Sequence, residues 1–197
     1  MALISCPKCG KQISDKAVKC PHCGVDLTEP FGEYDDSFFE LVENVLDALE
    51  WDYDVDHEKK CFVSQNLPSY SSIGSIRISV SVIPESGIGD DASNHMYIWG
   101  CYESFNYKGP NACKIYELIG RLNADYITPP LLFNEESGFI SCTYISLMGS
   151  KSMTSDYIKL ALICVMKRLQ DSGDAIMLVA HGIATPEQAA NSAQNDE

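Results

Sequence analysis

The chain of 197 residues is long enough for one ordinary domain with a small appendage, and its 45% hydrophobic residues exclude a disordered chain. The formal net charge is −14 and is distributed unevenly, because residues 1–27 carry +2 and the remainder carries −16. Such an acidic body repels phosphate backbones and anionic lipid headgroups, which disfavours nucleic acid as the main partner, and no apolar run approaches the roughly 18 residues of a membrane span.

The amino-terminal segment contains the motif Cys-Pro-x-Cys-Gly twice. The first copy holds Cys6 and Cys9, and the second holds Cys20 and Cys23. Each short loop directs two sulfur atoms toward one point, so the four thiolates can surround a Zn²⁺ ion as a tetrahedron. The glycine after each pair tolerates the positive φ that turns backbone N–H groups toward the thiolates. We therefore predict Cys6, Cys9, Cys20 and Cys23 as the metal ligands; two disulfides, a redox-active pair, or His22 as a ligand fit the spacing less well.

The predicted zinc is structural. A segment this short cannot bury a core of its own, so metal binding has to supply its folding energy, on the order of 10–16 kcal/mol by analogy with zinc-finger peptides. Four protein ligands leave no open position for a substrate. Residues 4–27 resemble the small zinc-ribbon modules of bacterial proteins. We assign residues 1–27 to a zinc ribbon and residues 28–34 to a linker.

The body begins with a helical pattern that changes to alternation. Ser37 and Glu40 have the spacing of a capping box, which predicts the start of a helix. Residues 51–56 alternate apolar residues with aspartate, and residues 76–82 alternate isoleucine or valine with polar residues. Both segments are therefore predicted strands with one buried face. Two further strands and a loop are predicted at residues 61–63, 96–102 and 87–94.

The second half of the body is predicted to contain a helix, a hairpin and two more helices. These elements begin at Pro110, Leu131, Thr154 and Thr185. Residues 134–138 supply the hairpin turn, between strands at residues 131–133 and 139–147. The sequence Thr185-Pro186-Glu187-Gln188 combines a cap with a first-turn proline and predicts a short last helix before a polar tail at residues 191–197.

This order of elements predicts an α+β fold, in which helices pack on one mainly antiparallel sheet. Three local features accompany it: Leu122-Asn123 at the end of the middle helix, the hairpin from Phe133 to Ile145, and the sequence from His181 to Ala189. With these features, residues 35–190 resemble the YbjN-like family, whose fold is similar to that of type III secretion chaperones. The resemblance implies a non-enzymatic, chaperone-like or regulatory role in bacteria, without catalytic residues.

The remaining polar and sulfur-containing residues form no motif typical of catalysis. Asp52, Asp54 and Asp56 begin like an EF-hand loop, but glycine and the bidentate glutamate do not follow at the required positions. The histidines of the body are isolated in sequence, and we expect structural roles for His57, His95 and His181. Five unpatterned cysteines are predicted to be reduced, small apolar residues of the core: Cys61, Cys101, Cys113, Cys142 and Cys164.

The sequence thus predicts a non-enzymatic protein-interaction module in which a zinc ribbon precedes a chaperone-like α+β domain. Its expected partner is another protein, and a homo-oligomer stays open. Two alternatives are weak nucleic-acid binding through the four lysines of the ribbon, and an enzyme whose site the sequence does not reveal. Because no leader is visible at the amino end, we expect a cytoplasmic location.

Overall fold

A computed structural model describes residues 3–5, 11–14, 17–24, 36–84, 94–125, 129–146 and 153–195. Its strands form a two-stranded sheet in the amino-terminal segment and a six-stranded sheet in the body. In the first, β1 (Leu3–Ser5) pairs antiparallel with β2 (Gln12–Ser14), and Ile4 lies opposite Ile13. The predicted linker, residues 28–34, lies outside the described residues.

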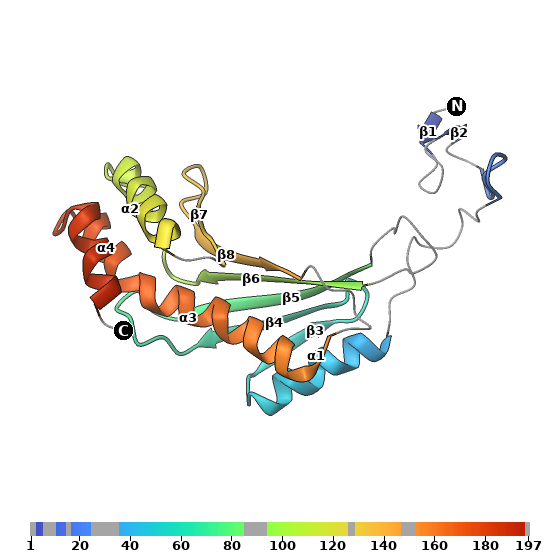
Figure 1. Ribbon diagram of the computed structural model, residues 1–197, viewed down its shortest axis with the longest axis horizontal. Coiled ribbons are helices and arrows are strands. Elements are labelled where there is room, and N and C mark those ends of the chain that lie inside the picture. Colours follow the sequence, from blue (N-terminus) through green and yellow to red (C-terminus); the bar gives the residue numbers. More distant parts are fainter. Residues whose placement is uncertain are drawn as a thin grey trace.

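The six-stranded sheet of the body is antiparallel throughout, in the order β3-β4-β5-β6-β8-β7. Its strands are β3 (Tyr53–Asp56), β4 (Cys61–Leu67), β5 (Ile76–Pro84), β6 (Asn94–Tyr102), β7 (Leu131–Phe133) and β8 (Ile140–Ile145). The helices are α1 (Asp36–Ala48), α2 (Ala112–Asp125), α3 (Ser155–Ala180) and α4 (Pro186–Asn195). The body is therefore an α+β domain, as predicted, with the helices packed on the sheet (Figure 1).

Alternation of apolar and polar residues decides which face of the sheet enters the core. Ile76, Ile78, Val80 and Val82 of β5 are all buried, whereas the residues between them are half-buried. Because successive side chains of a strand point to opposite faces, one face of β5 lies in the core and the other does not. The strand predicted at residues 76–82 is confirmed and extends to Pro84.

Helix α3 runs across the buried face of the sheet (Figure 1). Its apolar side chains, predicted from their helical spacing, are fully buried, among them Ile158 and Leu162. The close approach depends on Gly100 of β6. A Cβ atom at that position would lie 2.8 Å from both Leu169 Cδ1 and Val165 Cγ1, so only glycine leaves room for the helix.

Hydrogen bonds of the Asn123 side chain connect α2 with β7 and α3. Asn123 Nδ2 donates to the carbonyl oxygen of Leu131 at 2.9 Å, and the Leu131 N–H donates back to Asn123 Oδ1 at 2.9 Å. Arg168 of α3, 2% exposed, donates from Nη2 to the same Oδ1 at 3.0 Å. A single asparagine therefore satisfies the outward backbone groups of Leu131 and a donor of a buried arginine.

Two helix starts differ from the predictions. Helix α1 begins at Asp36, so Ser37 lies inside the helix and does not cap it. Helix α2 begins at Ala112, two residues after Pro110, because Asn111 makes the turn: its carbonyl accepts from the N–H groups of Lys114 and Ile115. The predicted start is too late for α1 and too early for α2. Differences of one or two residues are usual for helix ends.

The other two helix starts are confirmed. Thr154 caps α3 and accepts a hydrogen bond from the Tyr157 N–H at 3.3 Å. At α4 the Gln188 N–H donates to Thr185 Oγ1 at 3.2 Å, and the Thr185 N–H donates to Gln188 Oε1 at 3.0 Å, which is a reciprocal capping box. Helix α4 then continues to Asn195, five residues into the segment predicted as a polar tail.

Candidate metal centre and interaction surfaces

The second cysteine motif forms a tight turn. The Gly24 N–H donates to the Cys20 carbonyl oxygen at 2.9 Å, with Gly24 at φ +76°, so Cys20 and Cys23 are held on one loop. The His22 N–H donates to Cys20 Sγ at 3.4 Å. A backbone N–H bonded to sulfur stabilises a thiolate, and the positive φ explains why glycine follows the second cysteine.

These features suit a metal ligand pair. Cys20 is 2% exposed and Cys23 is exposed, and neither cysteine is in a disulfide. His22 is exposed at the tip of the turn. The other two predicted ligands, Cys6 and Cys9, lie outside the described residues. In the described part of the chain, two of the four thiols that a tetrahedral zinc site needs are therefore brought together on a suitable loop.

The amino-terminal segment is similar to a known family. Residues 2–27 match the model of a zinc-ribbon domain, a range that includes all four predicted ligands. The first region of the chain is thus a zinc-ribbon domain, followed by an α+β domain with an antiparallel sheet. Zinc-ribbon domains bind Zn²⁺ through cysteine thiolates, which is the donor set found here.

A comparison with curated protein sequences gave no match for the chain. The YbjN-like identity of residues 35–190 therefore stays a prediction. Within the described part of the chain, no helix is long and apolar enough to cross a membrane.

The cysteines of the body fall into three environments. Cys101 and Cys142 are buried as predicted, and Cys61 and Cys164 are half-buried. Cys113 is exposed on α2, so its predicted place in the core is wrong; its position on the solvent side of the helix explains this. Burial raises the pKa of the Cys101 thiol to about 11 and that of the Cys142 thiol to about 12. Both thiols are protonated at neutral pH and are poor nucleophiles.

The histidines and aspartates singled out in the sequence do not come together. His57 packs its ring against Phe39, with the centroids 5.6 Å apart, and His95 Nδ1 lies 2.9 Å from the Ser146 carbonyl oxygen. His181 is the C-cap of α3. Asp56 accepts from the N–H groups of the turn that follows it, which lowers the pKa of its carboxyl. In the described ranges no group of three or more potential metal-ligating side chains is found.

The helices that contact the sheet all contact one face. Phe39 of α1 stacks on Phe62 of β4 with the ring centroids 4.3 Å apart, and Tyr116 of α2 contacts Phe133 of β7 at 4.9 Å. The register places Phe62, Gly100 and Phe133 on the same side of the sheet as the buried residues of β5. The opposite side, which we call the open face, has no helix on it among the described elements.

The open face has few charges for so acidic a chain. One row across it, from β4 to β8, consists of Val63, Ser79, Trp99 and Thr143, and the next row contains Tyr97 and Ile145. Trp99 and Tyr97 are half-buried at the centre, whereas Ile145 and Leu132 near the β7 edge are 56% and 51% exposed. The aspartates Asp54 and Asp56 stand at the other edge, on β3. This surface was not found by sequence reasoning, because alternation shows which residues are buried but not whether a second layer covers the remaining ones.

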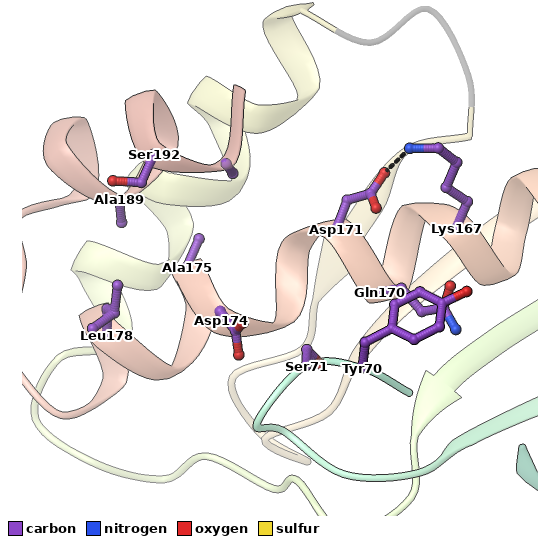
Figure 2. Close-up of a pocket in the computed structure, with 11 residues that line it drawn as sticks. Tyr70, Ser71, Lys167, Gln170, Asp171, Asp174, Ala175, Leu178, Ala189 and Ser192 are labelled. Carbon is purple, nitrogen blue, oxygen red and sulfur yellow. Dashed lines mark hydrogen bonds and ion pairs between the residues drawn. The ribbon is translucent and has the colours of Figure 1, made fainter. Parts of the chain in front are cut away.

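A crevice of about 720 Å³ lies between α3, α4 and the loop at residues 68–72 (Figure 2). Its polar groups are engaged in internal contacts. Lys167 Nζ pairs with Asp171 Oδ2 at 2.6 Å, and Asp174 accepts from the backbone N–H and the hydroxyl of Ser72, each at 2.6 Å. The Asp174 contacts therefore connect the loop to α3, and these polar groups of the crevice have a structural role.

Proposed function

We propose that the protein is a non-enzymatic interaction module: the zinc ribbon is a metal-stabilised structural element, and the α+β domain recognises another polypeptide. The observation that carries the proposal is the open face, a sheet surface with central Trp99 and Tyr97 and without a covering layer among the described elements. A chaperone-like or regulatory role agrees with the YbjN-like resemblance of residues 35–190.

The size and composition of the open face support this role. The six strands are three to nine residues long and about 4.8 Å apart, which gives each face of the sheet an area of roughly 600 Å², at the lower end of the range for protein interfaces. Tryptophan and tyrosine are the residues that most often dominate binding energy at such interfaces. Nucleic acid is a poor candidate for this surface, because stacking platforms for single strands carry interleaved lysines and arginines, and the two central rows contain neither.

The cysteines and histidines support a non-enzymatic reading. Cys101 and Cys142 are protonated at neutral pH, and His57, His95 and His181 each contact a different part of the fold. A protonated thiol is a poor nucleophile, so neither Cys101 nor Cys142 supplies an activated thiolate at neutral pH.

Site-specific photo-crosslinking tests the proposal. The full chain carries benzoylphenylalanine in place of Tyr97 on the open face, and a matched chain carries it in place of Tyr70, a tyrosine that is 87% exposed on the loop beside α3. We expect discrete crosslinked polypeptides in cells from position 97 and only background from position 70. The additional substitution Ser79→Glu should abolish the product, because it places a carboxylate beside Trp99. Equal products from both positions, or no polypeptide product from position 97, would contradict the proposal.

A further inference from the structure

Strand β8 is only partly covered by its outer neighbour. Strand β7 pairs with residues Ile140, Ser141 and Cys142, whereas the pairing with β6 extends from Ser141 to Ile145. Thr143, Tyr144 and Ile145 thus belong to the sheet on their β6 side and extend beyond the end of β7.

Backbone hydrogen bonds show where the peptide groups of these residues point. The Ser146 N–H donates to the Met96 carbonyl oxygen at 2.8 Å, which makes this pair a hydrogen-bonded pair of the β6–β8 ladder. Hydrogen-bonded and non-hydrogen-bonded pairs alternate in an antiparallel ladder, so Tyr144 also bonds to β6, and the N–H and C=O groups of Thr143 and Ile145 point away from β6. The bond from the Asn134 N–H to the Phe139 carbonyl oxygen, 3.0 Å, gives the same parity on the β7 side.

The chain before β7 does not take up these groups. In the β7–β8 register Pro130 would oppose Thr143, and proline has no N–H to donate. Cys142 Sγ donates to the Pro129 carbonyl oxygen at 3.8 Å. Because the Cys142 side chain is on the helix side of the sheet, Pro129 lies on that side and does not continue strand β7. Among the described residues, no strand pairs with Thr143 or Ile145 on this side.

The other edges of the sheet are protected. The outward backbone groups of Leu131 on β7 are occupied by the side chain of Asn123. The edge strand β3 is four residues long and carries Asp54 and Asp56, and short, charged edges oppose strand addition. In the described part of the chain, the free segment of β8 has neither a side chain bonded to its outward backbone groups nor a charged residue.

The walls beside this segment are apolar. A cavity of about 470 Å³ lies against it, lined by Pro130, Leu132, Tyr144, Ile145 and Tyr157 among others, with no charged side chain. The Tyr144 and Tyr157 hydroxyls are hydrogen-bonded to each other on the helix side. A chain placed here would therefore meet backbone donors and acceptors at its edge and apolar side chains on both of its faces.

We propose that the free edge of β8 at Thr143–Ile145 binds an extended, uncharged segment of a partner polypeptide as an added β-strand. This inference rests on the proposed function and specifies the conformation and chemistry of the segment that is recognised. A partner strand satisfies the outward peptide groups and places alternate side chains against Leu132 and Ile145 on one face and against the two tyrosines on the other. A second copy of the chain fits less well, because only three residues of its β8 are free before its own β7 intervenes.

A labelled model peptide tests strand addition to the full zinc-loaded chain. The probe is Lys-Thr-Val-Thr-Val-Thr-Val-Thr-Lys with a fluorescent label, measured by anisotropy at physiological salt. A second peptide carries N-methyl groups on two adjacent central residues, which removes donors from both edges, and the matched control carries the same two groups at its ends. We expect the centrally methylated peptide to bind roughly tenfold more weakly and the end-methylated control to bind like the parent.

Substitutions on the protein locate the site. Thr143→Pro removes the outward donor without removing a bond to β6 and should weaken binding of the parent peptide roughly tenfold, whereas Thr143→Val should not. Amide exchange by NMR should show unprotected Thr143 and Ile145 in the free protein, protected Tyr144, and slower exchange at Thr143 and Ile145 when the peptide is bound. If Thr143→Pro fails to fold, the methylated peptides and the exchange data still decide.

Three results would overturn the proposal. These are protection of the Thr143 and Ile145 amides in the free chain, equal binding of both methylated peptides, and peptide-induced protection elsewhere but not on β8. Each of them leaves the crosslinking result at position 97 untouched, so failure of strand addition is distinguishable from failure of the proposed function.

Discussion

The zinc ribbon and the α+β domain are stabilised by different physics. In the ribbon, β1 and β2 are three residues each and, among residues 11–14 and 17–24, only Ile13 and Cys20 are buried. The α+β domain instead buries a continuous apolar cluster that reaches from Phe38 on α1 to Ala190 on α4. We therefore expect the first region to depend on its metal and the second on its core. The two regions also differ in what they show about function. The cysteine pattern of the ribbon directly indicates a metal site, whereas the core of the α+β domain indicates no function, which has to be inferred from the surface of the domain.

The largest expected effect is loss of zinc from the ribbon. Cys20→Ser removes one of four predicted thiolate ligands, and metal binding is worth on the order of 10–16 kcal/mol in comparable modules. We expect zinc measured by plasma mass spectrometry to fall from about one ion per chain to background, with collapse of the ribbon signals in the NMR spectrum. The thermal midpoint of the α+β domain should not change.

A body cysteine provides the matched control for this prediction. Cys113 is exposed on α2, so Cys113→Ser should keep both the zinc content and the thermal midpoint. Zinc retained in Cys20→Ser, or lost in Cys113→Ser, would break the separation between the two regions.

The second prediction concerns a substitution that destabilises the α+β domain and leaves the ribbon unchanged. Asn123→Ala leaves the Leu131 peptide groups and a donor of buried Arg168 without this partner, and we expect a loss of about 3 kcal/mol in the free energy of unfolding by urea. Zinc content should stay the same. Arg121→Ala, which removes only the exposed pair with Glu117 on the same helix, should cost about 0.5 kcal/mol or less. Equal losses in the two variants would show that the Asn123 contact is unimportant.

The third prediction concerns alkaline pH. Burial raises the pKa of Cys142 from 9.0 to about 12, so its stabilising contribution is complete below pH 9 and is lost as the pH rises toward 12. Each pH unit in that window costs about 1.4 kcal/mol. In Cys142→Ser the decline in unfolding free energy between pH 9 and pH 10, followed by circular dichroism in urea, should be smaller by about 1 kcal/mol, because the unfolded thiol is only half ionised at pH 9. Identical pH dependence in the variant would contradict the assigned cause.

The smallest effect is expected at the start of α4. Thr185→Ala removes the side-chain half of the capping box and should cost about 1 kcal/mol. Ser192→Ala changes an exposed hydroxyl that bonds back to the Gln188 carbonyl oxygen within the same helix, and should change the free energy of unfolding by less than about 0.5 kcal/mol. A loss confined to Ser192→Ala would show that the cap does not hold the helix.

Much of the fold could be predicted from the sequence, because it depends on local patterns. Alternation at residues 76–82, the turn at residues 134–138 and the cap at Thr185 each need only neighbouring residues to be recognised. Helix ends were less certain, since Ser37 and Pro110 compete with equally good starts one or two residues away. The zinc-ribbon domain could be predicted because its cysteine motif is short and occurs twice.

The interaction surfaces could not be predicted in this way. The free edge at Thr143 results from Pro130, which ends the pairing of β7 and is distant from Thr143 in sequence. The protection of the other edge, at Leu131, depends likewise on Asn123 of a different element. Gly100 is an ordinary strand residue in the sequence, and its purpose is visible only when α3 lies on it. Such features depend on which elements meet in three dimensions, and a single sequence does not specify that.

The central claim is that zinc maintains the ribbon while the α+β domain carries recognition. The most direct test is the yield of the crosslinked polypeptide from benzoylphenylalanine at position 97, measured on the zinc-loaded chain and again after complete chelation of the metal. We expect the same product at nearly the same yield in both states. Loss of the product on chelation would show that the folded ribbon takes part in binding the partner, and recognition would then not belong to the α+β domain alone.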